Sequence, residues 1–553
     1  MLLAENKHAL RFEPADYWKG RKAERNRTGK MRKEICDVLV IGASLGGVQA
    51  ARAAAESGAS VLLCEETEWI GGQLTSQAVP PDEHPWIETT GATRSYREYR
   101  EKVRSYYRSL PQASDAMRYA KEFCPGNSWV SRIAHEPKVA HDILLDSLRP
   151  WMECGKLKLL THTVACSANV DRDRIVDVTL RNTLSDEEIL AQADLFLDAT
   201  DCGDLLPLVG AEYRTGAESK QQTGEPHALE REDPQDIQPV TWVAALELDP
   251  DAQTDWKIPR PELYGAFSKI VAPYDDNLQL SWYSADAETG KKRQLLMFDG
   301  EMGPQSLGLW SYRRIIDSAH YTDGRKEVTL LNWPANDYSV GNVYDCYDAP
   351  LHRELARQLT LCTVYWLQND APRKDGGTGY RVRLRPDITG TPDGLAMAPY
   401  IRESRRIVAH TTVREQDISR ASQSTLPRFA DSVGVGHYAV DVHMTTRSHT
   451  FFYEKTWPFE IPLGAMIPIR MENLLPACKN IGCTHLTNGC YRLHPVEWNI
   501  GEVAGYLAGY CIGKRMTPLQ VWQTQCEQFQ ELLVDKGVQL HWDISLLKGL
   551  KLD

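Results

Sequence analysis

The sequence predicts an α/β protein, and three apolar runs with the segments between them carry that prediction. Val38 to Ile41 is a short β-branched run of the kind found in buried parallel strands. A glycine-rich turn and a helix of small residues, Val48 to Glu56, follow it, and a second strand is expected from Ser60 to Cys64. Another apolar run, Leu195 to Ala199, ends in a polar turn. Strands that alternate with helices in this way favour a sheet with parallel strands.

The turn after the first strand has the composition of a phosphate-binding turn. It reads GASLGG, in which Gly42 allows the tight turn and Gly47 allows the helix to pack closely on the strand. Backbone N–H groups at the helix N-terminus attract a pyrophosphate, although Ser44, in place of the middle glycine, narrows the space beside them. Glu65 follows the second strand, where an acid accepts hydrogen bonds from ribose hydroxyls. The unit therefore predicts dinucleotide binding.

Composition excludes several classes of protein. The 553 residues are 42% hydrophobic and 25% charged, as in ordinary globular proteins. A formal net charge of −12 argues against a nucleic-acid partner. No apolar run has the length of a transmembrane helix, and the polar, locally basic arm at residues 1–34 lacks the apolar core of a signal peptide. A cytoplasmic protein without a membrane partner is expected.

The cysteines predict neither a disulfide framework nor a metal site. There are thirteen of them, an odd number, and none forms a C-x-x-C pair. In a chain of this length they are expected to be reduced and mostly buried. Cys478, Cys483 and Cys490 lie close together in the sequence, but their spacing matches no zinc-binding pattern. No metal is expected.

Five separated motifs now point to one family. They are GASLGG with Glu65, TEWIGGQLTSQ at 67–77, LDATDCGD at 197–204, PYIRESRRI at 399–407, and NLLPACKNIGCTHLTNGCYRLHPVEWNIGEVAG at 473–505. Together they resemble the FAD-dependent oxidoreductases with a glutathione-reductase-like nucleotide-binding domain, the broad group that includes fumarate reductase. The resemblance extends from about residue 36 to 515. It implies noncovalently bound FAD in a Rossmann-like domain assembled from discontinuous segments, with a mixed α+β substrate domain.

This resemblance gives the expected domain order. Residues 1–34 are an arm, and 35–212 are the first part of the FAD-binding domain, with a helical insertion at 77–150 and a β-meander at 156–190. In the insertion, helices are expected from about Thr93 to Leu110 and from Pro137 to Met152. The substrate domain is expected at 213–440, the return of the FAD-binding domain at 441–515, and an amphipathic helix at 516–553.

The resemblance also implies which residues contact FAD. They are Gly42, Ser44, Leu45, Gly46, Gly47, Glu65, Glu66, Gly72, Gln73, Val164, Ala199, Thr200, Asp201, Asn488, Gly489 and Arg492. A helix from Pro495 is expected to direct its N-terminus at the flavin and to stabilise the anionic reduced ring, with Asn488 and Gly489 in a turn beside it. Simpler interpretations stay open: a plain capped turn for the motif near residue 200, and helix packing for Gly501 and Gly505.

Four residues are the candidates for catalysis. Arg402 and Arg405 occupy a motif in which this group often uses a cation to bind a carboxylate or to donate a proton; an internal ion-pair network is the alternative. His443 alternates with Asp441 on one face of an expected strand. His494 belongs to the flavin motif. A purely structural role is the alternative for each histidine.

The sequence lacks motifs that are typical of several related enzymes. The segment around Gly434 and Gly436 is not followed by a helix, so no separate NAD(P)H-binding unit is expected. We therefore expect a dehydrogenase or oxidase that transfers a hydride between a small polar organic substrate and flavin N5, with oxygen or an external acceptor reoxidising the flavin. Alternatives are a tailoring enzyme of secondary metabolism that couples dehydrogenation to rearrangement, and a flavin-bearing RNA-modifying or scaffold protein. The sequence fixes neither the substrate nor the oligomeric state.

Overall fold

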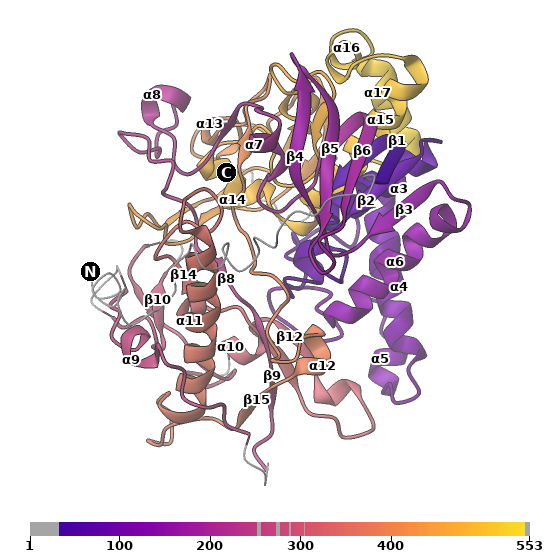
Figure 1. The fold of residues 1–553 in the computed structure, drawn as a ribbon. Helices are drawn as coiled ribbons and strands as arrows, with labels where there is room; N and C mark the ends of the chain where they lie inside the picture. The colour runs from indigo at the N-terminus through magenta and orange to yellow at the C-terminus, as the bar shows by residue number, and fades with distance from the viewer. Residues whose placement is uncertain (1–31, 252–255, 273–276, 287–288, 304, 548–553) are drawn as a thin grey trace.

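A computed structural model of the protein describes residues 32–251, 256–272, 277–286, 289–303 and 305–547 (Figure 1). It confirms the α/β class. The predicted arm lies mostly outside the described residues. Its residues 32–34 do not belong to an arm but begin the first strand, β1 (Arg32–Ile41), because they continue the parallel pairing of β1 with β6 (Glu188–Asp198).

The central sheet has seven strands, in the order β3-β2-β1-β6-β5-β4, with β21 (Leu474–Pro476) pairing with β6 as well. The other members are β2 (Val61–Cys64), β3 (Leu157–Leu160), β4 (Thr163–Asp171) and β5 (Arg174–Asn182). Parallel ladders join β3 to β2, β2 to β1, and β6 to both β1 and β21. The sheet is therefore mixed and is assembled from segments far apart in the chain.

The predicted β-meander is only partly right. β3 pairs in parallel with β2, so it belongs to the parallel layer, and only β4, β5 and β6 form antiparallel ladders. The apolar run that begins at Leu195 forms the last part of the eleven-residue β6, which starts earlier, at Glu188, and ends at Asp198, one residue before Ala199. The reason is that β6 changes partner along its length: residues 188–191 pair with β5, whereas 196–198 pair with β21.

Two helices from opposite ends of the sequence pack against each other beside this sheet. They are α3 (Leu45–Glu56) and α15 (His494–Lys514). A Cβ atom added to Gly501 would lie 2.0 Å from the carbonyl oxygen of Gly46, and one on Gly505 would lie 2.2 Å from that of Ala50. Only glycine allows this approach, which fixes α15 against the phosphate-binding turn. The insertion helices α4 (Arg94–Ser109) and α6 (Pro137–Glu153) agree with prediction to within one residue.

Two predictions near the C-terminus are wrong. Asn488 and Gly489 lie in a helix, α14 (His485–Tyr491), and not in a turn, because Thr484 and Thr487 form a capping box that starts the helix. The single terminal helix is instead two short ones, α16 (Pro518–Thr524) and α17 (Cys526–Lys536), which Gln525 separates. Gly537, with φ of +88°, ends α17.

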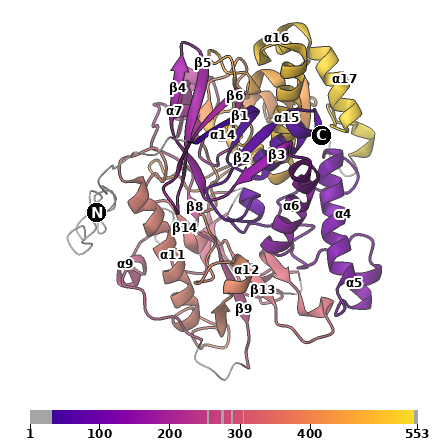
Figure 2. The same cartoon turned by 45° about the vertical axis from the view of Figure 1, so that its right-hand side comes forward.

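A second, four-stranded antiparallel sheet lies in the other half of the molecule (Figures 1 and 2). Its strands are β12 (Arg314–Ile316), β13 (Val328–Leu331), β9 (Ala244–Leu248) and β15 (Val382–Leu384), and α11 (Ala349–Asn369) lies beside them. Ala245 and Leu330 pack into the core of the nucleotide-binding half, whereas Leu246 and Leu331 pack into a separate core with α11. Because side chains alternate along a strand, one face of this sheet packs into the first core and the other face into the second, so the sheet separates the two cores.

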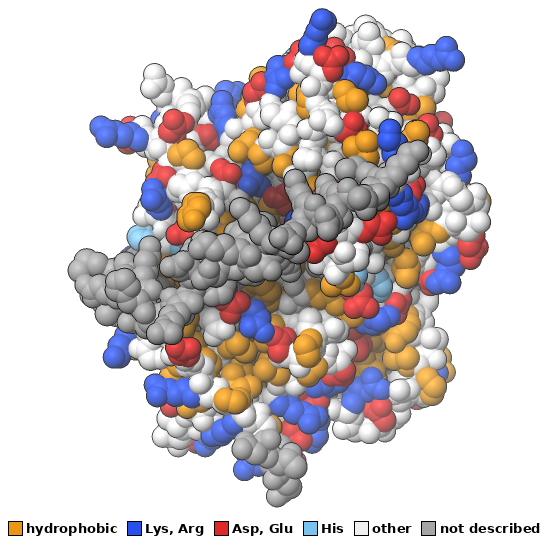
Figure 3. Space-filling model, viewed as in Figure 1, with side chains coloured by type: hydrophobic (Ala, Val, Ile, Leu, Met, Phe, Trp, Pro, Cys, Tyr) orange, Lys and Arg blue, Asp and Glu red, His pale blue; other side chains and the backbone are white. Residues whose placement is uncertain are grey.

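The remaining elements are short. The helices are α5 (Asp115–Tyr119), α7 (Leu205–Leu208), α8 (Lys220–Thr223), α9 (Tyr264–Phe267), α10 (Leu309–Tyr312), α12 (Pro386–Thr389) and α13 (Glu415–Ile418). The strands are β7 (Tyr213–Arg214), β8 (Val240–Thr241), β10 (Tyr283–Ala285), β11 (Lys292–Gln294), β14 (Asp337–Tyr338), β16 (Arg406–Ile407), β17 (Ser432–Gly436), β18 (Val440–Val442), β19 (Phe452–Glu454) and β20 (Phe459–Pro462). In the described part of the chain, no helix has both the length and the apolar character needed to cross a bilayer. On the face drawn in Figure 3, basic and acidic side chains are interspersed.

Candidate active site

A cavity of about 350 Å³ opens where several strands of the central sheet end. Eight of the residues predicted to contact the cofactor line it: Gly42, Ser44, Glu65, Glu66, Val164, Ala199, Thr200 and Asp201. They come from the ends of β1, β2 and β6 and from the start of β4. In open α/β sheets, ligands bind in the crevice at the carboxyl ends of the parallel strands. We call this space the first cavity.

The glycine turn has backbone N–H groups without acceptors, one of them on Ser44, which lines this cavity. Ser44 is the N-cap of α3, and its Oγ accepts a hydrogen bond from Gly47 N at 3.2 Å. Gly46 N donates to Glu497 Oε1 at 3.2 Å. The backbone N–H groups of Ser44 and Leu45 have no acceptor among the described residues. Free N–H groups at a helix N-terminus fit a phosphate group.

Glu65 has a strongly perturbed carboxyl group. It accepts hydrogen bonds from Ala43 N at 2.9 Å and from Thr67 N at 3.0 Å. Burial raises its pKa to about 7, although these hydrogen bonds act in the opposite direction. Burial also raises the pKa of Asp198, beneath the turn after β6, to about 7. Both carboxyl groups therefore take up protons near neutral pH.

Seven predicted cofactor residues are buried but do not line the first cavity: Leu45, Gly46, Gly47, Gly72, Gln73, Asn488 and Gly489. The glycines are packed by protein. A Cβ on Gly46 would lie 2.0 Å from Ala477 O, and one on Gly489 would lie 2.9 Å from Asp441 N. Gln73 Oε1 and Asn488 Oδ1 are buried acceptors without a donor among the described residues. They fit a group that brings N–H or O–H donors, as the flavin ring and the ribityl chain of FAD do.

Sequence reasoning missed two cations near this cavity. Lys479 is fully buried, and its Nζ lies 2.5 Å from Asp201 Oδ1 and 3.8 Å from Glu497 Oε2. Burial opposes its charge, but Asp201 outweighs this and the pKa of Lys479 is raised. Arg353, on α11, lines the first cavity, and its Nε donates to Val343 O at 2.8 Å. Lys479 belongs to a quoted motif, but Arg353 has no local sequence signal.

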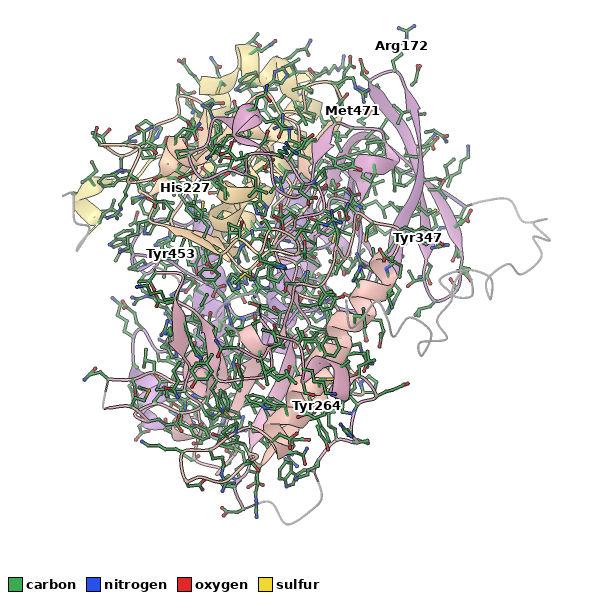
Figure 4. All side chains as sticks on the ribbon, turned by 90° about the vertical axis from the view of Figure 1, so that its left-hand side faces the viewer. Arg172, His227, Tyr264, Tyr347, Tyr453 and Met471 are labelled. Carbon is green, nitrogen blue, oxygen red and sulfur yellow. The ribbon has the colours of Figure 1, made fainter. Side chains whose placement is uncertain are left out.

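A second cavity of about 480 Å³ lies on the other side of the segment 399–402. Pro399 and Ile401 line the first cavity, whereas Tyr400 and Arg402 line the second. An adjoining space of about 280 Å³ shares several lining residues with the second cavity, and Tyr453 on β19 lines it too. Figure 4 shows Tyr453 at a height between Arg172 near the top of the view and Tyr264 near the bottom.

The second cavity holds a histidine between two carboxylates. His443 Nδ1 lies 2.9 Å from Asp337 Oδ2, and its Nε2 lies 3.4 Å from Asp441 Oδ2. Burial and Arg402 would lower the pKa of His443, but the two carboxylates outweigh them and raise it. Burial alone would raise the pKa of each aspartate. Arg402 and His443 nevertheless lower that of Asp337 to about 2, and His443 with Arg492 lowers that of Asp441 to about 2.

Three buried arginines surround this group. Arg402 Nη2 lies 2.9 Å from Asp337 Oδ1, and its Nη1 donates to Thr241 Oγ1 at 2.9 Å. Arg492 Nη1 donates to Tyr400 OH at 2.6 Å, and Arg492 Nη2 lies 3.4 Å from Asp441 Oδ2.

The third arginine forms a separate pair. Arg313 makes two hydrogen bonds with Asp82, at 2.9 and 3.2 Å. Arg402 and His443, two of the catalytic candidates, thus lie together with Arg492, which was predicted to contact the cofactor. Arg313 and Asp82 were missed.

The other two catalytic candidates lie elsewhere. Arg405 donates to Asp204 at 2.8 Å and to Cys202 O at 2.9 Å, so it joins the strand end of β6 to the second half of the molecule. His494 is fully buried: its Nδ1 accepts from Asp82 N at 3.1 Å, and its Nε2 faces Val79 O at 3.2 Å. Burial lowers the pKa of His494 to about 4. Neither residue lines the second cavity, and both hold other segments in place.

Comparison with known proteins agrees with this geometry. A family described as "FAD dependent oxidoreductase" matches residues 37–533. No curated protein gave a match.

Several solved structures show weak overall similarity. A variant of E. coli quinol fumarate reductase FrdA is 13% identical, over 90% of this chain and 74% of that chain, with a TM-score of 0.30. OxyS anhydrotetracycline hydroxylase from Streptomyces rimosus is 11% identical, over 91% and 68%, with a TM-score of 0.30. L-proline dehydrogenase from P. horikoshii is 16% identical, but the match covers 35% of this chain and 26% of that one, with a TM-score of 0.18. On the family match over nearly its whole length, the chain belongs to the FAD-dependent oxidoreductases.

Proposed function

We propose that the protein transfers a hydride between a small polar organic substrate in the second cavity and N5 of noncovalently bound FAD, which oxygen or an external acceptor then reoxidises. The observation that carries this proposal is the segment 399–402. Its residues alternate between a cavity with the features of a nucleotide site and a cavity rich in charged side chains. Cofactor and substrate would therefore approach each other across one short stretch of chain.

The residues of the first cavity are the ones expected to hold the cofactor. The free N–H groups at the start of α3 suit the pyrophosphate, and Glu65 suits the ribose hydroxyls. Arg353 and Lys479 supply positive charge among several carboxylates. When bound, FAD supplies the atom that accepts or gives the hydride.

Side chains of the protein itself would orient the substrate and supply a proton to it. Arg402 is held in place by Asp337 and Thr241, so its guanidinium group can orient a polar substrate. His443 carries a proton between Asp337 and Asp441. In the reducing direction it gives this proton to the substrate, and in the oxidising direction it takes the proton back.

The test begins with purified protein. Flavin absorbance is expected, and anaerobic addition of alcohols, amines and acids is expected to bleach it with one class of substrate. Arg402→Ala should slow bleaching at least tenfold, whereas Arg149→Ala, an exposed arginine on α6, should leave the rate unchanged. A protein that lacks flavin and cannot be reconstituted with FAD would contradict the proposal.

The main alternative keeps FAD but couples dehydrogenation to rearrangement of the substrate, as in a tailoring enzyme. The space adjoining the second cavity favours a substrate larger than a simple alcohol. Mass spectrometry of the product separates the two: the loss of two hydrogens with an intact skeleton supports the first proposal.

A role on RNA is disfavoured by the interspersed charges of Figure 3. Thirteen cysteines without a disulfide suit the cytoplasm.

A further inference from the structure

Several residues that line the second cavity carry buried hydrogen-bond donors that lack acceptors. Five residues that line it carry a buried side-chain N–H group with no partner among the described residues: Arg313 Nε, Asn332 Nδ2, Trp333 Nε1, Arg402 Nε and Arg492 Nε. In the same described lining, no buried side-chain acceptor is left unsatisfied. An unpaired buried donor costs free energy that a ligand with acceptor atoms can recover. The imbalance therefore selects for a ligand rich in acceptors.

The charges in the same lining are also unbalanced. Arg313, Arg402 and Arg492 are each at most 5% exposed, and the two carboxylates beside His443 raise its pKa and so favour its charged form. Arg293 also lines the cavity, but it is exposed to solvent. Against the other four cations stand three carboxylates, Asp82, Asp337 and Asp441. One positive charge is in excess, and a buried charge is costly unless it is paired. A ligand with one negative charge would neutralise it.

The rest of the wall is apolar. Leu295, Leu296 and Leu307 line the second cavity, and Phe451 lines the adjoining space. Trp129 and Tyr312 line both, with ring centroids 4.7 Å apart. The wall therefore offers both charged and flat apolar side chains, with Arg313 Cζ 4.9 Å from the centroid of the Tyr312 ring, and this combination fits an amphipathic ligand.

We propose that the substrate is an organic monoanion, with a carboxylate bound among Arg313, Arg402 and Arg492 and an apolar, ring-sized body against Trp129 and Tyr312. This inference rests on the proposed function, because it assigns a substrate class to the same cavity. A reduced flavin also carries one negative charge, so the excess positive charge has a second conceivable partner. The two are separated by working with the oxidised protein, whose flavin ring is neutral.

The experiment measures binding and not turnover. Oxidised, FAD-loaded protein is titrated with phenylacetate, phenylacetamide, phenethylamine and acetate, and the change in flavin absorbance and in Tm gives the affinity. Phenylacetate and phenylacetamide have the same shape but differ in charge. We expect phenylacetate to bind at least tenfold more tightly than phenylacetamide and than acetate, and phenethylamine not to bind.

Variants test where the carboxylate binds. Arg402→Gln and Arg492→Gln should each reduce the preference for phenylacetate over phenylacetamide to less than threefold, while Arg149→Gln preserves it. Arg492 makes its short hydrogen bond, 2.6 Å, with the neutral hydroxyl of Tyr400 and lies 3.4 Å from the carboxylate of Asp441, whereas Arg402 lies 2.9 Å from that of Asp337. Arg492→Gln therefore leaves no closely paired carboxylate without its partner if Arg402→Gln fails to fold. A preference unchanged in Arg492→Gln would overturn the inference.

The outcomes also separate this inference from the proposed function. Equal binding of acid and amide by the oxidised protein would overturn the inference and assign the excess charge to the reduced flavin, even if a neutral substrate bleaches the flavin. If phenylacetate binds tightly and phenylacetamide does not, but no electron donor bleaches the flavin, the inference is supported and the proposed function is contradicted.

Discussion

Ser44 has two neighbours that limit what can replace it. Its Oγ accepts the hydrogen bond from Gly47 N that begins α3, and its Cβ would lie only 3.2 Å from a Cβ placed on Gly72. The serine side chain therefore fits between the turn and the following glycines, and it stabilises the helix start that is expected to face the phosphates.

This gives a prediction at Ser44. Ser44→Gly should retain FAD and lose at most about 1 kcal/mol of unfolding free energy, because glycine is a tolerated N-cap. Ser44→Phe should lose FAD, because its ring has no space beside Gly72 except in the first cavity. Flavin absorbance after desalting and urea unfolding measure the two effects. Loss of FAD in Ser44→Gly would instead show that the hydroxyl itself holds the cofactor.

His443 and its carboxylates predict how stability varies with pH. The pKa of His443 is raised in the folded protein. Its contribution to the free energy of unfolding is therefore full below the pKa of the unfolded state, about 6.5, and is lost as pH rises through the pKa of the folded state. The pKa values of Asp337 and Asp441 are lowered to about 2, so their contribution is present above about pH 4 and is lost toward pH 2. Burial raises the pKa values of Glu65 and Asp198 to about 7, so both proteins should lose stability as pH rises toward 7. Urea unfolding from pH 5.5 to 9 should therefore show a smaller total decline for His443→Gln than for the parent protein. An identical decline in both would assign it to another group.

The sequence identifies some of these residues and not others for a physical reason. Arg402 lies in a motif that resembles the family, and His443 alternates with Asp441 on one face of an expected strand, so short stretches of sequence identify both. Arg313 and Asp82 are 231 residues apart and meet only after folding. Arg405 and His494 have residue types that suit catalysis, but their burial and partners depend on tertiary contacts.

At the scale of elements, the contact between α3 and α15 positions the phosphate-binding turn. Gly46 and Gly501 are in backbone contact, and Glu497, in the first turn of α15, accepts from Gly46 N. The strands β1 and β2, the insertion helices and the start of α15 follow from local composition. The parallel pairing of β3 and the change of partner along β6 do not, because strand pairing is decided by segments distant in sequence.

Two substitutions in one helix test this contact. Gly501→Ala places a Cβ 2.0 Å from the backbone oxygen of Gly46, so it should cost several kcal/mol of stability and lower FAD content. Gly513→Ala, on the exposed end of α15, meets nothing within 4 Å and should stabilise by roughly 0.5–1 kcal/mol. Thermal unfolding and flavin content are measured for both. Equal effects would show that the helices can separate without harm to the site.

At the scale of the molecule, the β12-β13-β9-β15 sheet joins two cores. Because its side chains enter both, neither core is complete without it. Arg405 adds a polar link between the two halves by its bonds to Cys202 O and Asp345.

We therefore expect the two halves to unfold together. Far-UV circular dichroism and tryptophan fluorescence, to which Trp310, Trp333 and Trp366 of the second core and Trp498 of the first contribute, should give the same Tm. FAD at 100 times its Kd should raise the stability by about 2.7 kcal/mol and shift both signals equally. Two separate transitions, with only one shifted by FAD, would show that the halves fold independently.

The position of the segment 399–402 has a consequence for laboratory evolution of substrate range. Tyr400 and Arg402 alternate along the chain with Pro399 and Ile401, which line the first cavity. Substitutions in this segment are therefore expected to disturb the FAD site as well as the substrate site. Residues such as Leu307 and Phe451 line only the space on the substrate side. Libraries confined to those positions should yield altered selectivity with intact flavin, whereas libraries at Pro399 and Ile401 should yield mostly protein that has lost FAD.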